Sequence, residues 1–327
     1  MTRPIVVTGA AGFIGTNTVR ALNAAGREDV IVVDELGTDD KWRNLTDQAF
    51  ADYMDLHEFR ERAMLDDLPE VEAVIHLGAC SATTEPDADY LADNNYAYTR
   101  DLCEWSLRTG ARFVYASSAA TYGDGSLGYS DDHDGMAALR PLNMYGYSKH
   151  MFDMWALRKG LLGDIAGVKY FNVYGPYEDH KGDMRSVIHK SYHQIVETGR
   201  VGLFKSYRDE YPDGGQVRDF VSVDDAVAVT LWLAANPQAN GVFNCGTGRS
   251  RSWLDLANAV FAALDREPAV DFIDMPDHLK GKYQYHTEAD PAKLRAAGYD
   301  RPFAELEDGV RDYVQGYLMK RFPPAQP

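Results

Sequence analysis

The chain has 327 residues, of which 45% are hydrophobic and 25% are charged, and this composition excludes disordered and fibrous proteins. Its 33 lysines and arginines face 50 aspartates and glutamates, and the net charge of −17 disfavours partners with phosphate backbones or anionic lipid surfaces. The longest apolar run, residues 226–235, covers only about half of a bilayer. The three cysteines lie far apart and indicate neither a disulfide framework nor a zinc site. We therefore expect a cytoplasmic protein without a membrane, nucleic-acid or metal partner.

The first half of the chain alternates between apolar strands and helices. The predicted elements, in chain order, are a strand at 3–8, a helix that ends near 25, strands at 30–33 and 71–77, a helix at 88–108, a strand at 113–117, a helix at 144–159 and a strand at 167–171. Strands rich in β-branched residues with helices between them form right-handed crossovers and a parallel sheet. The sequence therefore predicts an α/β fold with a doubly wound parallel sheet.

The alternation loosens after Asn172, where the segment 174–176 interrupts it, and returns with a strand at 217–221, a helix at 224–235 and a strand at 241–245. We expect two lobes and a short tail. The first lobe comprises 1–171 and about 217–245, the second and smaller α/β lobe comprises 172–216 and 246–322, and the tail is 323–327. The cleft between the lobes is the expected ligand site.

Three glycines separate the first predicted strand from the first helix. Gly9 allows a tight turn, Gly12 lets the backbone approach a pyrophosphate, and Gly15 lets the helix pack on the sheet. Asp34 ends the second strand, where its carboxylate would either bind a ribose hydroxyl or cap the loop. A glycine triple alone is weak, but its place between a strand and a helix favours a dinucleotide-binding motif over an ordinary turn. The first lobe is then the dinucleotide-binding domain and the second the substrate-binding domain.

Tyr145 and Lys149 are four residues apart and share one face of a predicted helix. A nearby ammonium stabilises a phenolate, which would bring the tyrosine toward use as a general base. The pattern occurs by chance in many chains, and Tyr177 with Lys181 is a second match here. Because Pro176 and the polar residues around it place the second match outside a helix, we prefer the first.

Two segments of small residues follow strands at the edge where a parallel sheet binds its ligands. Ser117 and Ser118 end the strand at 113–117, and a hydroxyl there can bind a reacting oxygen beside the tyrosine, although one of the two serines would serve to form the turn. Residues 78–81 follow the strand at 71–77 and are small enough for close approach by a dinucleotide, so Cys80 is interpreted as packing rather than chemistry.

Together with residues 94–96 and 172–176, these motifs resemble the extended short-chain dehydrogenase/reductases that act on nucleotide sugars. The further segments that carry a closer resemblance, to the ADP-glyceromanno-heptose 6-epimerase family, are 78–81, 116–123, 141–143, 180–182, 218–221, 279–284 and 294–299. This resemblance covers nearly the whole chain and includes the expected second lobe. It implies a Rossmann-type fold, an ADP-heptose substrate, a homo-oligomer and inversion at C6″ through a transient ketone.

The resemblance also implies roles for individual residues. Tyr145, Ser118 and Lys149 match the acid/base tyrosine, its hydroxyl partner and a lysine that also binds the cofactor ribose, and Lys181 matches a second acid/base residue on the opposite face of the sugar. The residues implied to bind the cofactor are Gly9, Gly12, Phe13, Ile14, Gly15, Asp34, Glu35, Lys41, Leu77, Gly78, Ala79, Cys80, Ser81, Asn94, Lys149, Val173 and Lys181. Those implied to bind the substrate are Asn172, Asp183, Lys190, Phe204, Lys205, Ser206, Tyr207, Arg218 and Tyr283.

A sugar diphosphate needs positive groups, and Arg218, Lys205, Lys280 and Lys282 supply them in an acidic chain. The cofactor is expected to be NADP, with NAD as the alternative. Asp34 would repel a 2′-phosphate, whereas Lys41 and Arg43 would attract one.

The chain departs from the family pattern at a few positions. Leu56 stands where a lysine near the 2′-phosphate is expected, Asp183 and Lys190 replace a serine and a histidine, and the loop 208–216 is longer. Two alternatives remain at this point. One is another nucleotide-sugar epimerase or dehydratase, although a dehydratase would favour an acidic residue within 119–121, where none occurs. The other is a non-catalytic protein that senses the cofactor.

Overall fold

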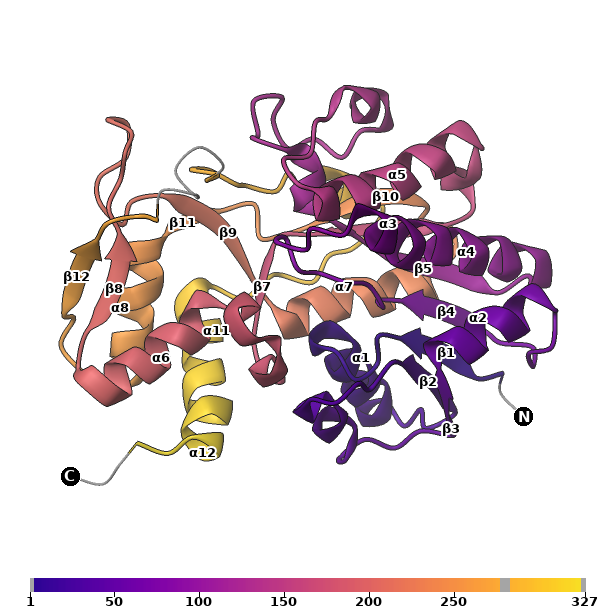
Figure 1. The fold of residues 1–327 in the computed structure, drawn as a ribbon, viewed down its shortest axis with the longest axis horizontal. Coiled ribbons are helices and arrows are strands. Elements are labelled where there is room, and N and C mark those ends of the chain that lie inside the picture. Colours follow the sequence, from indigo (N-terminus) through magenta and orange to yellow (C-terminus); the bar gives the residue numbers. More distant parts are fainter. Residues whose placement is uncertain (1–2, 277–282, 325–327) are drawn as a thin grey trace.

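A seven-stranded sheet forms the centre of the computed structural model, which describes residues 3–276 and 283–324 (Figure 1). All its strands are parallel, in the order β10-β6-β5-β4-β1-β2-β3. They are β1 (Ile5–Thr8), β2 (Val30–Asp34), β3 (Asp52–Asp55), β4 (Ala73–His76), β5 (Arg112–Ser118), β6 (Ala166–Tyr170) and β10 (Gly241–Cys245). The predicted Rossmann-type doubly wound parallel sheet is confirmed.

Helices cover both faces of this sheet (Figure 1). One face carries α1 (Phe13–Ala24) and α7 (Val223–Ala235), and the other carries α2 (Leu56–Met64), α4 (Tyr98–Thr109) and α5 (Met144–Arg158). The helix predicted at 88–108 is present as α3 (Ala88–Leu91) and α4, joined by a π-helical turn, η2 (Ala92–Ala97). The strand order reverses between β1 and β4, so the ligand crevice is expected at the carboxyl ends of these two strands.

The remaining elements form a smaller α/β part with its own sheets. A three-stranded sheet consists of β11 (Ser250–Ser252), β9 (Val217–Ser222) and β7 (Asn172–Tyr174), and a two-stranded sheet of β12 (Val270–Ile273) and β8 (Val201–Phe204). The helices are α6 (Val187–Thr198), α8 (Trp253–Ala263), α11 (Leu306–Tyr313) and α12 (Met319–Arg321), whereas α10 (Ala292–Ala296) packs against β10 of the large sheet. β10 extends the large sheet, whereas β9, expected with the first lobe, pairs with β7 and β11. The exact residue boundary between the lobes stays a prediction.

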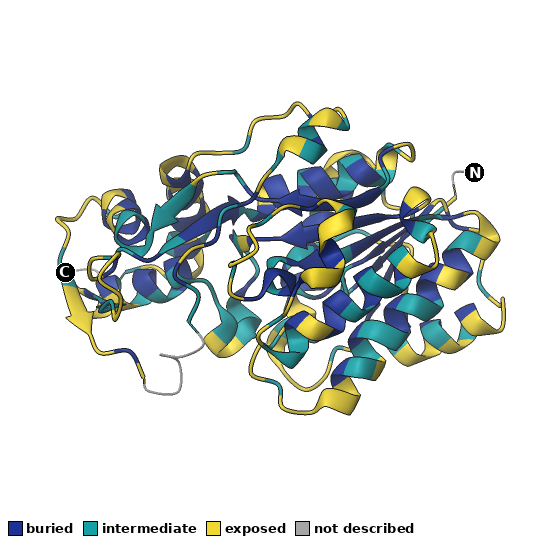
Figure 2. Cartoon of the chain, turned by 90° about the horizontal axis from the view of Figure 1, so that it is seen from above, coloured by how far each residue is buried: buried dark blue, intermediate teal, exposed yellow. Residues whose placement is uncertain are grey.

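Apolar burial explains which strands the sequence revealed. β1 and β2 are buried along their whole length and read as continuous β-branched runs. β3 lies at the edge of the sheet, its first two residues are exposed, and no apolar run marks it in the sequence. Figure 2 shows the buried residues gathered in the strands and on the inward sides of the helices. No helix in the described ranges 3–276 and 283–324 is long and apolar enough to cross a membrane.

Candidate active site

The glycine turn lies against the end of β4 with no room for side chains. Gly9 has a φ of +66°, and a Cβ placed on it would be 2.7 Å from the Cα of Gly78. A Cβ on Gly15 would be 1.9 Å from the carbonyl oxygen of Gly9. Gly12 is the N-cap of α1 and makes no side-chain cap, so free N–H groups of a 12-residue helix face the crevice. This is the cradle that a dinucleotide pyrophosphate requires, and the residues present fit it.

Asp34 closes the floor of the crevice beside that turn. Its Oδ2 accepts a hydrogen bond of 2.8 Å from the N–H of Ala11, and its Oδ1 lies 2.8 Å from Nζ of Lys41. Leu56, the first residue of α2, lines the same region. The charge of Lys41 is therefore already matched by a carboxylate, and an apolar side chain occupies the place where a second lysine was expected.

One cleft of about 750 Å³ joins the glycine turn to the ends of β4, β5 and β6 and to residues of the smaller part. All the residues implied to bind the cofactor line this cleft, as do Ser118, Tyr145 and Asn172. Predicted residues from far apart in the sequence thus meet the glycine turn at one edge of the sheet. Their assignment to a bound cofactor stays a prediction. No cluster of three metal-ligating side chains occurs in the part of the chain that the structure describes.

Tyr145 lies in the first turn of α5 because Asn143 caps that helix. The Oδ1 of Asn143 accepts a hydrogen bond of 2.8 Å from the N–H of Gly146. Burial raises the pKa of Tyr145 above its ordinary value, and a hydrogen bond with Ser118 acts in the opposite direction. Burial also lowers the pKa of Lys149 to about 8, against a smaller opposing effect of Asp153. The tyrosine, its hydroxyl partner and the lysine are together, as the sequence predicts.

An asparagine that the sequence analysis did not select connects two parts of this site. Asn95 lies in the π-helical turn η2 and is fully buried. Its side chain accepts from the N–H of Cys80 and donates to the carbonyl of Cys80, both at 2.9 Å, and donates to Oγ of Ser148 at 3.0 Å. It therefore fixes the segment 78–81 against the helix that carries Tyr145. The pair Asn94-Asn95 was the only sequence signal for it.

Lys181 approaches the cleft from the loop after β7. Its Nζ lies 5.0 Å from the centre of the Phe13 ring, at the start of α1. Burial lowers the pKa of Lys181, and the carboxylate of Glu178 opposes that effect. Lys181 and Tyr145 thus belong to different segments but line the same cleft. A half-buried amine with a lowered pKa is suited to take up and release a proton.

The loop that carries Lys181 is held by side chains from both parts of the molecule. Asn17 of α1 donates to the carbonyl of Pro176 at 2.9 Å, and Asn44 donates to His180 at 3.2 Å and to the carbonyl of Ala11 at 2.9 Å. Glu178 is fully buried and accepts a hydrogen bond of 2.9 Å from the hydroxyl of Tyr313. The sequence analysis selected none of these anchors.

Arg218 and Tyr283 form a wall next to the cleft rather than its lining. The guanidinium of Arg218 lies 5.1 Å from the ring centre of Tyr283 and 5.6 Å from that of Trp253. Nε1 of Trp253 donates to the hydroxyl of Tyr283 at 2.8 Å, and the edge of Phe204 packs on the same tyrosine. Trp253 and Gln284 line the cleft directly, and sequence reasoning missed both roles.

The other residues implied to bind substrate lie outside the cleft lining. Nζ of Lys205 lies 3.1 Å from a carboxylate oxygen of Asp274, to which Tyr207 also donates. Ser206 does not line the cleft, and its hydroxyl donates a hydrogen bond of 2.9 Å to the carbonyl of Arg208. Nζ of Lys190 donates to the carbonyl of Asp183 at 2.5 Å. The structure does not bring these five positions to the cleft lining, and Lys280 and Lys282 lie outside the described residues, so the positive cluster stays a prediction.

The molecule is a Rossmann-type α/β protein in which a glycine turn and a tyrosine–lysine pair line one cleft. The model of the NAD dependent epimerase/dehydratase family matches residues 5–246, and the chain belongs to this family. A protein of Nitratidesulfovibrio vulgaris strain Hildenborough is 57% identical over 319 residues, which is 97% of this chain and 99% of that protein. A protein of Fusobacterium nucleatum is 46% identical over 97% of this chain and 98% of its own. Both relatives are named ADP-L-glycero-D-manno-heptose-6-epimerase.

Solved structures of the same kind superpose on nearly the whole chain. The ADP-L-glycero-D-manno-heptose-6-epimerase of Helicobacter pylori has a TM-score of 0.81 at 25% identity and covers 96% of each chain. The UDP-glucose 4-epimerase of Thermotoga maritima, solved with UDP-glucose, has a TM-score of 0.78 at 28% identity over 97% of this chain and 99% of its own.

Proposed function

We propose that the chain is an ADP-L-glycero-D-manno-heptose 6-epimerase. It would invert C6″ of the heptose in ADP-D-glycero-D-manno-heptose by oxidising the carbinol to a ketone and reducing it from the other face. The names of the full-length relatives at 46–57% identity support this reaction. The epimerisation is redox-neutral, so one cofactor would serve every turnover without leaving.

The chemistry requires hydride transfer and proton transfer at the same carbinol. The carbon has no acidic hydrogen, so simple deprotonation cannot invert it, and the nicotinamide ring would accept the hydride and return it. Tyr145, with Ser118 beside it, would take the hydroxyl proton in one orientation of the sugar. Lys181 would serve the opposite orientation, because it reaches the cleft from a different segment. Lys149 would hold the cofactor ribose.

The observation that carries the proposal is that Tyr145 and Lys181 line one cleft, both half-buried and supplied by different segments. Incubation of the purified protein with each epimer of the ADP-heptose, followed by chromatographic resolution, tests it. We expect the two epimers to reach the same equilibrium mixture from either side. No interconversion by protein that retains its cofactor would remove the proposal.

For the cofactor we propose NADP, with NAD as the alternative. Lys41 lies at the crevice floor and would shift its ion pair from Asp34 toward a 2′-phosphate. Asp34 itself and the apolar Leu56 favour a free 2′-hydroxyl. Mass spectrometry of the nucleotide released from purified protein tests the choice, and NAD alone would show that the missing lysine decides it.

Two further parts of the proposal come from the family resemblance and from the thiols. We expect a homo-oligomer, which light scattering measures directly. Cys80, Cys103 and Cys245 are free, in keeping with a reducing cytoplasm.

The alternative function within the family is epimerisation or dehydration of another nucleotide sugar. The structural likeness to a UDP-glucose 4-epimerase favours including UDP-glucose in the same assay. Turnover of UDP-glucose but not ADP-heptose would select that alternative. If the protein bound the cofactor but turned over neither sugar, the remaining hypothesis would be a non-catalytic protein that senses the cofactor.

A further inference from the structure

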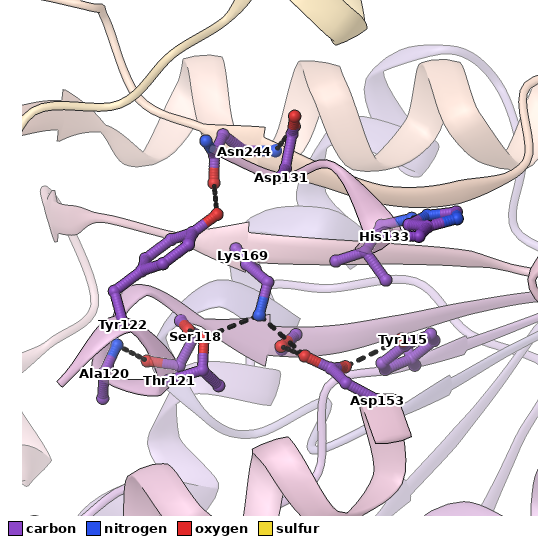
Figure 3. Close-up of polar contacts among 12 residues, drawn as sticks. Tyr115, Ser118, Ala120, Thr121, Tyr122, Asp131, His133, Asp153, Lys169 and Asn244 are labelled. Atoms are coloured by element: carbon purple, nitrogen blue, oxygen red, sulfur yellow. Dashed lines mark hydrogen bonds and ion pairs between the residues drawn. The ribbon is translucent and has the colours of Figure 1, made fainter. Parts of the chain in front are cut away.

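A buried ion pair joins β6 to α5, the helix that carries Tyr145 and Lys149 (Figure 3). Nζ of Lys169, on β6, is 2.8 Å from Oδ2 of Asp153, on α5, and the two side chains are 1% and 0% exposed. The ring centre of Tyr122 lies 5.1 Å from the same ammonium. Such a pair adds little stability compared with apolar residues of the same volume, because both charges lose their hydration. Its place in the fold suggests another role.

The pair is connected by hydrogen bonds to the strand and turn that carry Ser118. Lys169 donates to Oγ1 of Thr121 at 2.6 Å, and Thr121 donates to the carbonyl of Ser118 at 2.8 Å. On the carboxylate side, Ser117 donates to Asp153 at 2.7 Å. The hydroxyl of Tyr115 donates to the other oxygen of Asp153 at 2.8 Å. Figure 3 shows these contacts converging from β5, the turn after it, β6 and α5.

Asp153 also stands in register with the proposed acid/base residues on its own helix. It follows Lys149 by one turn and Tyr145 by two turns of α5, which places the three on one helix face. We propose that Asp153 and Lys169 are positioning residues that lock the helix face of Tyr145 and Lys149 to the turn of Ser118. The carboxylate of Asp153, one turn along the same helix face, also stabilises the charge of Lys149. This inference rests on the proposed function for the acid/base roles, but its test includes a readout that does not need the substrate.

The charge of Lys149 has few other sources of support in the described structure. The titratable groups that face it are Tyr145 and Asp153 on α5, Cys80 after β4, and His76 on β4. His76 is buried and its pKa is lowered to about 3, so it stays neutral. Asp153 and Cys80 are the two groups that raise the pKa of Lys149 against burial, and Asp153 has the larger effect. Loss of its carboxylate would therefore make Lys149 lose its proton at lower pH.

The decisive variant is the double substitution Asp153→Asn with Lys169→Met, because it removes both charges and leaves no unpaired buried ion. We expect it to fold, to lower kcat by about 10²-fold through misplacement of Tyr145 and Ser118, and to leave KM nearly unchanged. The part of the alkaline limb of the pH–kcat profile that follows deprotonation of Lys149 should move to lower pH. The single variant Asp153→Asn, with Lys169 left unpaired, should show the same pH shift and lower thermal stability.

The substrate-free readout is the affinity for NADP and NAD as a function of pH, measured by fluorescence titration. In the wild type this affinity should fall as Lys149 deprotonates near pH 8, and in the double variant the fall should begin at lower pH. Asp225→Asn is the matched control. It neutralises a buried carboxylate in the first turn of α7, which accepts hydrogen bonds from Oγ of Ser222 and from the N–H of Ala304. This control should lower stability without moving either pH profile.

The outcomes separate the two proposals. A double variant with wild-type kcat and unchanged pH profiles would overturn the positioning role and leave a purely structural ion pair. Absence of epimerisation in the wild type would overturn the proposed function, and the pH-dependent cofactor affinity would still decide the effect of Asp153 on Lys149.

Discussion

Tyr145 and Lys181 reach the same cleft but are held in place by different means. Tyr145 lies in the first turn of a 15-residue helix, and Asp153 of that helix forms a buried ion pair with Lys169 of β6. Lys181 lies in a short irregular segment, residues 179–184, in which Gly182 has a φ of +53°. Regular hydrogen bonding of a helix fixes the first residue, whereas a few side-chain amides and one carboxylate fix the second.

This difference predicts where each residue is vulnerable. Many backbone hydrogen bonds hold the helix together, so a single substitution on its surface should scarcely move Tyr145. The segment of Lys181 depends on Asn17, Asn44 and Glu178, so one substitution can displace it. Two groups that are proposed to share one acid/base role therefore need not be held equally firmly.

The largest effect is expected from removing either group. Tyr145→Phe and Lys181→Met should each lower the rate of epimerisation by several orders of magnitude, because general acid–base groups contribute on the order of 10²–10⁴-fold each. Both variants should fold and keep the cofactor, as checked by circular dichroism and by the absorbance of the released nucleotide. Nearly full turnover of Lys181→Met would return the lysine to a loop residue and leave a mechanism with one tyrosine.

The next effect tests the loop itself. Asn44→Ala removes the amide that joins His180 to the glycine turn, and we expect a loss of up to about 10²-fold in kcat through misplacement of Lys181. The matched control is Asn23→Ala, since Asn23 donates to the carbonyls of Arg27 and Ala49 far from the loop. It should lower stability alone.

A double variant decides whether Asn44 acts through Lys181. In a Lys181→Met background, Asn44→Ala should cost little further activity, because the group that it positions is already gone. If the losses of activity from Asn44→Ala and Lys181→Met multiplied in the double variant, Asn44 would act on the glycine turn instead.

The glycine turn and the pair of Tyr145 and Lys149 could be predicted because the residues of each lie close together in the sequence. Gly9, Gly12 and Gly15 follow a buried strand directly, and Tyr145 and Lys149 share one helix face, so spacing alone encodes their geometry. The order of buried strands likewise encodes the large sheet. The exposed edge strand β3 was missed because it has no continuous apolar run.

The contacts around Lys181 and Tyr283 could not be predicted in the same way, because they join residues far apart in the chain. Asn44 and His180 are separated by 136 positions, and Trp253 meets Tyr283 across 30. An isolated asparagine or tryptophan carries no signal of such a partner. The loop residues Lys205 and Tyr207 show the converse, since their family match is clear while their side chains contact Asp274 outside the cleft lining.

A smaller effect concerns the cofactor. Leu56→Lys places an ammonium at the crevice floor, where the carboxylate of Asp34 now matches the charge of Lys41. One additional charge-assisted contact should raise the preference for NADP over NAD by about tenfold. Leu65→Lys is the control, because Leu65 at the end of α2 is 70% exposed and does not line the cleft. If the ratio of the dissociation constants for NADP and NAD were the same in wild type and Leu56→Lys, the 2′-group of the adenosine ribose would lie away from Leu56.

The smallest effect on turnover is expected from substitution of His76, a buried residue at the end of β4. Its ring nitrogens contact the hydroxyls of Thr8 at 2.7 Å and Thr99 at 2.9 Å, and burial lowers its pKa from 6.5 to about 3. The folded protein keeps it neutral, whereas the unfolded chain binds a proton below pH 6.5, so stability present above that pH is lost as the pH falls. Between about pH 6.5 and about pH 5.5 this costs about 1 kcal/mol in the free energy of unfolding. Urea unfolding across this range should show a flatter pH dependence for His76→Gln than for the wild type, with nearly equal turnover at pH 8. Parallel slopes for the two proteins would mean that other groups account for the acid sensitivity and that His76 takes up a proton without unfolding.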